Sequence, residues 1–353
     1  MKRELLHVLI ISILTAVVMI PGPSLSASKK PSTLTELALY RGSDRQQILE
    51  DGAKKEGKVT LYTSGTQAVA PVGEAFEKKY PFVKVETWRS TSASLISRTV
   101  EEYKSGRHTF DVMEGTQSSM MVLQKLGISQ AFYVPSLAFM EEEGVTNAAG
   151  GGVLAVALRS HGVGFGYNTK LLGKAQIPKT YHDLLDNKWK GKLALAASDT
   201  GPNWAGAICS AFGEELLNKL ATQNFVIHTV SALTLLDMIV NGEYIASPTI
   251  FDSAVFGRKK LGAPVAWVPL EPVRVNVGQI ALSRYAPHSH AALLFADFKV
   301  SKESAEIHRS LGYDNFRKDV PPVEHRYKKY FGQDSVEEVK AEQNLFNRLF
   351  LKR

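Results

Sequence analysis

Cysteine is almost absent from this chain, which has one, Cys209, among 353 residues. A disulfide framework needs paired cysteines and a cysteine-rich zinc or iron–sulfur centre needs several thiolates, so the sequence excludes both. The nine histidines form no His-Glu-x-x-His pattern of a zinc protease. There is no Gly-x-Ser-x-Gly nucleophile elbow, and the glycines at 162, 164 and 166 lack dinucleotide-loop spacing. Several common catalytic motifs are therefore missing.

Charge of one sign does not dominate, because 42 basic residues stand against 35 acidic ones, for a net charge of +7. The basic residues are spread along the chain without interleaved aromatic repeats, which argues against nucleic-acid binding. Hydrophobic residues make up 44% and charged residues 22%, which is typical of a globular protein. A chain of this length favours two lobes over one core.

The apolar run at residues 8–20 is shorter than a typical membrane-spanning helix requires. It follows two basic residues and precedes small ones, an order that predicts a secretory signal peptide over residues 1–28 and a periplasmic mature protein. Cleavage is expected after Ser26 or Ser28. An uncleaved anchor is the alternative, and the absence of a nearby cysteine argues against lipid attachment.

Strand-like and helix-like patterns alternate through the rest of the chain. Strands are predicted over residues 58–62, 82–88, 109–113, 162–168, 191–197, 244–248, 263–269 and 273–283. Helices are predicted over residues 69–80, 94–104, 181–186, 203–220 and 336–351. This alternation predicts an α/β fold with parallel sheets covered on both faces, and such sheets bind ligands beyond the carboxyl ends of their strands.

Hydroxyl-bearing and small residues concentrate in five loops that follow predicted strands, mostly just before a helix. Free amide N–H groups and a positive helix end in such loops suit an anion, a carboxylate or a polyol. The candidate ligand-binding residues are Ser64, Gly65, Thr66, Arg89, Ser90, Glu114, Thr116, Ser198, Asp199, Asn203, Trp204, Asp252 and Ser253. The alternative is that these residues only cap helices and form turns.

Some candidates have a more specific alternative. Arg89 could clamp an anion, or it could pair with Glu86 or Glu114. Trp204 could stack on a ligand, although an aromatic residue in the first turn of a helix more often packs in the core. The charge of the solute stays open, because Arg89 favours a carboxylate or phosphate whereas Asp252 and Glu114 favour an amine or hydroxyl groups.

Several segments resemble, in order, the extracellular solute-binding proteins of ABC importers, in the branch that includes ferric-iron-binding proteins. The most specific is Pro-Lys-Thr-Tyr-His-Asp-Leu-Leu-Asp-Asn-Lys-Trp-Lys-Gly-Lys-Leu-Ala-Leu at residues 178–195; others lie at residues 57–64, 76–85, 110–112, 166–171 and 286–298. The resemblance implies a type II periplasmic binding protein fold, with two doubly wound α/β lobes joined by crossing strands around one solute. It implies a first lobe of residues 29–155, to which 275–325 return, and a second lobe of residues 156–274, on which 326–353 pack. The implied partners are a small-molecule solute and the permease and ATPase subunits, with a monomeric protein and no cofactor.

One departure from the family pattern bears on the solute. Ferric-binding members have adjacent tyrosines where this sequence reads Phe251-Asp252-Ser253. A hard trivalent cation needs anionic oxygen ligands, so the absence of the two tyrosines favours a small polar organic solute. We expect neither a metal site nor a catalytic residue in this chain. The alternatives are ferric-iron transport, an exported hydrolase with Glu114 or Asp252 as general base, and a sensor subunit that signals to a receptor.

Overall fold

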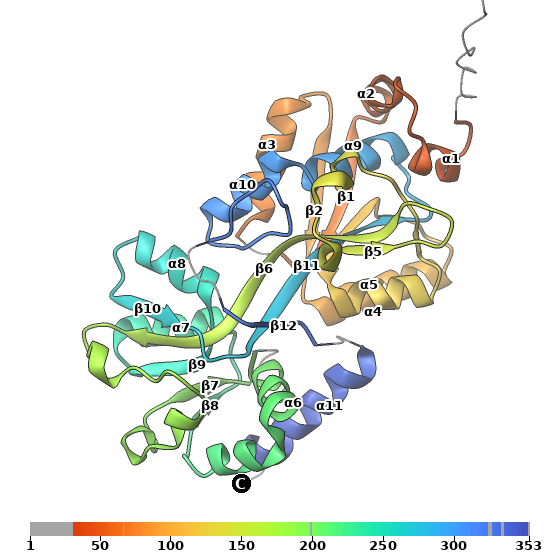
Figure 1. The fold of residues 1–353 in the computed structure, drawn as a ribbon. Coiled ribbons are helices and arrows are strands. Elements are labelled where there is room, and N and C mark those ends of the chain that lie inside the picture. Colours follow the sequence, from red (N-terminus) through yellow and green to blue (C-terminus); the bar gives the residue numbers. More distant parts are fainter. Residues whose placement is uncertain (1–30, 66, 198–199, 324–326, 333–334, 352–353) are drawn as a thin grey trace, which may run out of the picture.

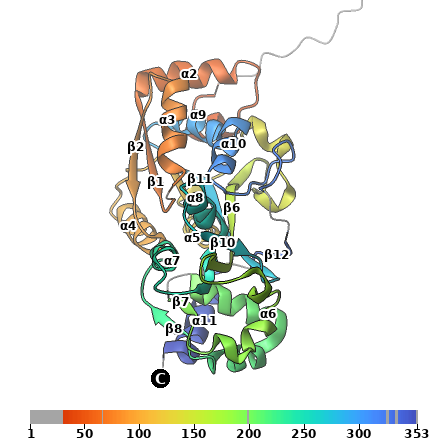
Figure 2. The ribbon, with the colours of Figure 1, turned by 90° about the vertical axis from the view of Figure 1, so that its left-hand side faces the viewer.

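The structure is a computed structural model that describes residues 31–351 except 66, 198–199, 324–326 and 333–334. The predicted signal peptide over residues 1–28 lies outside the described residues, as do the last two residues of the chain. Two α/β lobes are joined by the long antiparallel strands β6 (Val153–Asn168) and β11 (Val273–Ser283), which run from one lobe into the other (Figure 1 and Figure 2). None of the helices in the described part of the chain is long and apolar enough to span a membrane.

The first lobe is built on three parallel strands, with β1 (Lys58–Thr63) between β2 (Lys84–Arg89) and β3 (Val112–Thr116). Its helices are α1 (Leu34–Leu39), α2 (Arg45–Glu56), α3 (Val69–Lys79), α4 (Ser92–Lys104), α5 (Gln117–Lys125), α9 (Ser289–Lys299) and α10 (Lys302–Ser310). Short strands β4 (Ser129–Gln130) and β12 (Lys329–Tyr330) pair with β11, and β5 (Val145–Asn147) pairs with β6. The helices bury their apolar stripes, with Phe76 of α3 packed against Phe295 and Phe298 of α9.

The second lobe extends the same sheet, because β9 (Ala246–Phe251) and β10 (Val265–Val268) pair antiparallel with β6. A separate parallel pair is formed by β7 (Ala194–Ala196) and β8 (Val226–His228). The helices are α6 (Thr200–Ala221), α7 (Ala232–Asn241), α8 (Asp252–Lys260) and α11 (Val336–Phe346), and α11 lies along α6 (Figure 1). Short 3₁₀ helices cover Pro135–Phe139, Glu142–Gly144, Lys174–Gln176, His182–Leu185 and Asn187–Trp189, and a π-helical turn covers Asn347–Leu351.

The sheet departs from the predicted parallel arrangement. Its main path has the order β10-β6-β11-β3-β1-β2, and it is mixed because β6 and β11 cross between the lobes in opposite directions. The strand predicted over residues 109–113 lies instead over 112–116, which puts Glu114 inside β3 and not in the loop after it. The helix predicted over residues 181–186 is a 3₁₀ helix. Tertiary pairing decided these boundaries, which local propensity specifies weakly.

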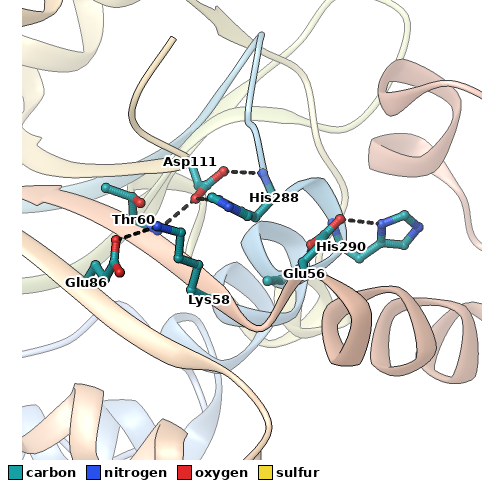
Figure 3. A network of polar contacts seen from close by, with 8 residues as sticks. Glu56, Lys58, Thr60, Glu86, Asp111, His288 and His290 are labelled. Atoms are coloured by element: carbon teal, nitrogen blue, oxygen red, sulfur yellow. Dashed lines mark hydrogen bonds and ion pairs between the residues drawn. The ribbon is translucent and has the colours of Figure 1, made fainter.

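Two carboxylates of the first lobe bind the segment that follows β11 and leads into α9 (Figure 3). The buried Asp111 accepts hydrogen bonds from Thr60 N at 2.7 Å, His288 N at 2.7 Å and His288 Nδ1 at 2.9 Å. Glu56, at the end of α2, accepts from His290 Nδ1 at 2.8 Å and from Ala291 N at 2.8 Å, and so caps α9. These contacts hold the amino ends of the strands, away from the carboxyl ends at which ligands are expected.

Candidate functional site

A cavity of about 540 Å³ lies between the lobes, where β1, β2, β3 and β9 end. Its floor is formed by the two crossing strands, through Arg159 and His161 of β6 and Asn276 and Gly278 of β11. The remaining lining residues are Ser64, Gln67, Arg89, Ser90, Thr91, Ser92, Gly115, Thr116, Thr200, Ser231, Ala232, Leu233, Phe251, Ser253, Ala254 and Tyr313. The volume is in the range of small-molecule sites.

The cavity brings together part of the predicted ligand-binding set. Ser64, Arg89, Ser90, Thr116 and Ser253 line it. Gly65, Glu114, Asn203, Trp204 and Asp252 are not among its lining residues, and Thr66, Ser198 and Asp199 lie outside the described residues. The interpretation of Trp204 as a stacking residue is wrong for this structure, because its side chain is 1% exposed and packs against Phe225 and Phe350.

Helices from both lobes begin at the cavity. Lining residues include Thr91, Thr116 and Ser231, the N-caps of α4, α5 and α7. Each side-chain oxygen accepts from a backbone N–H within its helix, at 3.2, 3.4 and 3.1 Å in that order. Lining residues Thr200 and Ser253 lie in the first turns of α6 and α8. Five helix N-termini therefore present partial positive charge and amide donors to one space, which favours an anion.

Two arginines contribute to the cavity lining. Arg89, at the end of β2, is exposed, and its Nε donates to the carbonyl oxygen of Gly65 at 2.7 Å. Arg159, in β6, is buried, with its guanidinium 5.1 Å from the ring centroid of Tyr313. The described lining residues include no aspartate or glutamate, so the charge of this lining is positive.

Glu114 lies behind the lining and is 1% exposed. Its carboxylate accepts from Lys299 Nζ at 2.7 Å and lies 3.5 Å from Arg159 Nε. Burial alone would raise the pKa of Glu114, but the charges of Lys299 and Arg159 outweigh burial and lower it to about 2. The interpretation of Glu114 as a general base is therefore wrong, because a carboxylate this acidic and this well paired is a poor proton acceptor.

His161 lies flat on Phe251 on the floor of the cavity, with ring centroids 3.9 Å apart. Its Nδ1 is 2.9 Å from Ser253 Oγ, and its Nε2 is 3.2 Å from Asn276 Oδ1. Burial, followed by the positive charge of Arg159, lowers the pKa of His161 to about 3, so the ring is neutral near pH 7. The ring therefore joins β6, β11 and α8 without adding charge to the site.

Asp252 faces away from the large cavity. Its carboxylate accepts from Gly162 N at 3.0 Å, Ser253 N at 2.6 Å and Tyr327 Oη at 2.9 Å, and it borders a separate cavity of about 110 Å³. Burial raises the pKa of Asp252 to about 7 despite these three hydrogen bonds. The carboxylate is thus part of the junction between α8, β6 and the segment after α10, and it does not line the site.

Sequence reasoning missed the floor of the cavity, because Arg159, His161 and Asn276 lie within strands and not in the loops after them. A usable signal exists in β6, where Arg159 and His161 interrupt a 16-residue strand that is otherwise mostly apolar or glycine. Charged residues are rarely buried in a strand unless they are paired or functional. Their spacing of two residues also puts both side chains on one face of the sheet.

Comparison with known proteins identifies the family. Residues 115–330 match the model of the family described as "Bacterial extracellular solute-binding protein". The chain belongs to this family. It is therefore a solute-binding protein and not an enzyme. A relative from Haemophilus influenzae, an uncharacterized protein, is 26% identical over 268 residues, which cover 72% of this chain and 76% of the relative.

The fold of this solute-binding protein is shared by solved structures over most of its length. Iron-bound HitA from Pseudomonas aeruginosa is 20% identical, with a TM-score of 0.70 over 83% of this chain and 99% of that one. AfuA from Actinobacillus pleuropneumoniae, solved with fructose-6-phosphate, is 23% identical, with a TM-score of 0.68 over 84% and 100%. An ABC-transporter substrate-binding protein from Agrobacterium tumefaciens is 17% identical, with a TM-score of 0.70 over 83% and 94%. Together they place this chain in the α/β periplasmic binding protein fold of type II.

Proposed function

We propose that this protein is the periplasmic solute-binding subunit of an ABC importer and that it captures a small organic anion between its lobes. The permease and ATPase of the importer would receive the solute. The observation that carries the proposal is Arg159, a buried cation on the cavity floor that shares one carboxylate with Lys299. A buried charge without full compensation is costly, and an anionic group of the solute would supply the missing charge.

The rest of the lining fits an anion attached to a polar body. Arg89 and the helix N-termini can bind a phosphate or carboxylate group. The hydroxyl groups of the lining and the Asn276 amide suit a polyol. The solute bound in the AfuA structure, fructose-6-phosphate, combines these features. We therefore propose a phosphorylated or carboxylated polyol as the solute.

Ferric iron is the less supported solute. The described lining residues include one tyrosine, Tyr313, and no carboxylate, whereas a hard trivalent cation needs several anionic oxygen ligands. Within the described part of the chain, no group of three or more His, Cys, Asp or Glu residues could hold a metal ion. A strong visible charge-transfer band on titration with a ferric chelate would support iron and contradict this choice.

Binding to charged and neutral forms of one sugar tests the proposal. By isothermal titration calorimetry, we expect the purified protein to bind fructose 6-phosphate, citrate or another organic anion, and not fructose. Arg159→Met should weaken anion binding by roughly tenfold to a hundredfold, because a charge-assisted hydrogen bond contributes about 1.5–3 kcal/mol. Lys190→Met removes the same charge at an exposed position outside the cavity lining and should leave binding unchanged. Equal binding of fructose, or full affinity in Arg159→Met, would contradict the proposal.

A further inference from the structure

A cluster of three charged side chains extends from the cavity floor into the first lobe, and each comes from a different element. Glu114 comes from β3, Lys299 from the end of α9 and Arg159 from β6. The side chains of Glu114 and Lys299 are each 1% exposed and that of Arg159 is 8% exposed. Of the three, only Arg159 lines the cavity. The cluster therefore joins the interior of the first lobe to the solute site.

The charges of this cluster do not cancel. Glu114 is ionised at neutral pH because its pKa is about 2. His308 is influenced by the same charges. Burial and then the positive charge of Lys299 lower the pKa of His308 to about 3, so its ring is neutral at neutral pH. Two cations therefore share one carboxylate, which leaves a net charge of +1 in the cluster of Glu114, Lys299, Arg159 and His308.

The distances show which cation uses the carboxylate. Lys299 Nζ is 2.7 Å from Glu114 Oε2, a charge-assisted hydrogen bond, whereas Arg159 Nε is 3.5 Å from Oε1, beyond a normal hydrogen bond. In the described residues, Glu114 is the only carboxylate within ion-pair distance of Arg159. The guanidinium otherwise packs on Tyr313 and beside Gly278. The positive charge of Arg159 is thus the less compensated of the two.

We propose that Lys299, which does not line the cavity, is a positioning residue for solute binding: it engages Glu114 and so leaves Arg159 available to the anionic group of the solute. This inference rests on the proposed function. Without Lys299, the carboxylate would pair with Arg159 alone, for which a bidentate geometry is accessible. The pair would then be neutral, and the solute would have to compete with Glu114 for the guanidinium.

A double-mutant cycle separates this role from a structural one. By calorimetry with fructose 6-phosphate and inorganic phosphate as probes, Lys299→Met should weaken binding by roughly tenfold or more. Glu114→Gln should retain native affinity or exceed it, since Arg159 then has no internal anion. The double variant Lys299→Met/Glu114→Gln should recover at least native affinity, although its thermal stability stays below that of the native protein. Loss of stability alone cannot produce such a recovery.

A matched control is Arg45→Met, which breaks the buried ion pair between Arg45 and Asp297 in the same lobe, away from the cavity. It should lower stability and leave affinity unchanged. Native affinity in Lys299→Met would overturn the role of Lys299, and so would a double variant whose affinity is no higher than that of Lys299→Met. Anion binding by the native protein would still support the proposed function in either case. Failure of the native protein to bind any anion would overturn both. If Lys299→Met does not fold, the Glu114→Gln variant still decides, because weakened binding there contradicts the inference.

Discussion

Asp252 and Ser253 are adjacent at the start of α8 and have different surroundings. Ser253 Oγ contacts His161 at the cavity, whereas the Asp252 carboxylate contacts Gly162 N and Tyr327 Oη. From the loop in the sequence, both residues are predicted to bind the ligand. The direction of each side chain follows from how α8 packs on β6, which depends on residues about 90 positions earlier in the chain.

We expect Asp252→Asn to remove part of the pH dependence of folding. Burial raises the pKa of Asp252 from 3.8 to about 7 in the folded protein. The protonated group therefore contributes its full stability below about pH 4, and this contribution is lost as the pH rises through about 7. Asparagine does not ionise, so the free energy of unfolding of the variant, from urea denaturation, should fall less steeply across this window. Burial also raises the pKa of Asp297, to about 6, but this group is present in the native protein and in the variant alike, so it does not affect the difference between them.

The affinity of the same variant for fructose 6-phosphate is the accompanying measurement. Because Asp252 does not line the cavity, Asp252→Asn should bind the probe as the native protein does. Parallel stability curves would show that the carboxylate stays ionised in the fold. Loss of affinity at unchanged stability would instead place Asp252 in the solute site.

At the scale of elements, the N-termini of several helices border the cavity beside the side chains of its floor. Each hydroxyl N-cap at the cavity accepts from the amide of the third residue of α4, α5 or α7, and the earlier amide groups of a helix have no partner within it and can bind a ligand. The sequence predicted a capping role and a binding role as alternatives. The capping role is present in the structure, and the binding role that we propose is compatible with it, because the same residues line the cavity.

Ser231→Ala should therefore affect both stability and binding. Loss of the cap on α7 should cost about 1 kcal/mol of unfolding free energy. Affinity for fructose 6-phosphate should also fall, because Ser231 lines the cavity. Ser335→Ala removes an equivalent cap, in which Ser335 Oγ accepts from Glu338 N at 3.0 Å on α11, outside the cavity lining. It should cost similar stability with no change in affinity, and equal affinities in the two variants would argue against a binding role for the start of α7.

At the scale of the whole molecule, the two lobes contribute opposite walls of one cavity, and the crossing strands form its floor. A solute that contacts both walls favours the closed arrangement, because only that arrangement makes both sets of contacts. Micromolar capture requires about 8 kcal/mol of binding free energy, which several charge-assisted hydrogen bonds can supply.

Saturating solute should decrease the radius of gyration if the lobes close on it. Small-angle X-ray scattering with and without fructose 6-phosphate measures this change, and fructose serves as the uncharged control. The radius of gyration of the Arg159→Met variant at the same solute concentration should remain closer to the solute-free value. An unchanged radius with calorimetrically confirmed binding would show that capture does not require closure.

The alternation of strands and helices and the family segments are local in the chain, and for that reason the sequence alone determined the fold class. The loops at strand ends are local as well, and they predicted a ligand site at the carboxyl ends of the strands. Pairing over long distances was decided by the tertiary structure. Glu114 and Lys299 are 185 residues apart, and no pattern in the sequence predicts that they meet. The same holds for Arg159 and His161, whose positions on the cavity floor depend on the register between β6 and β11. Local periodicity specifies which residues form an element, whereas the charge of a buried site depends on which elements pack together.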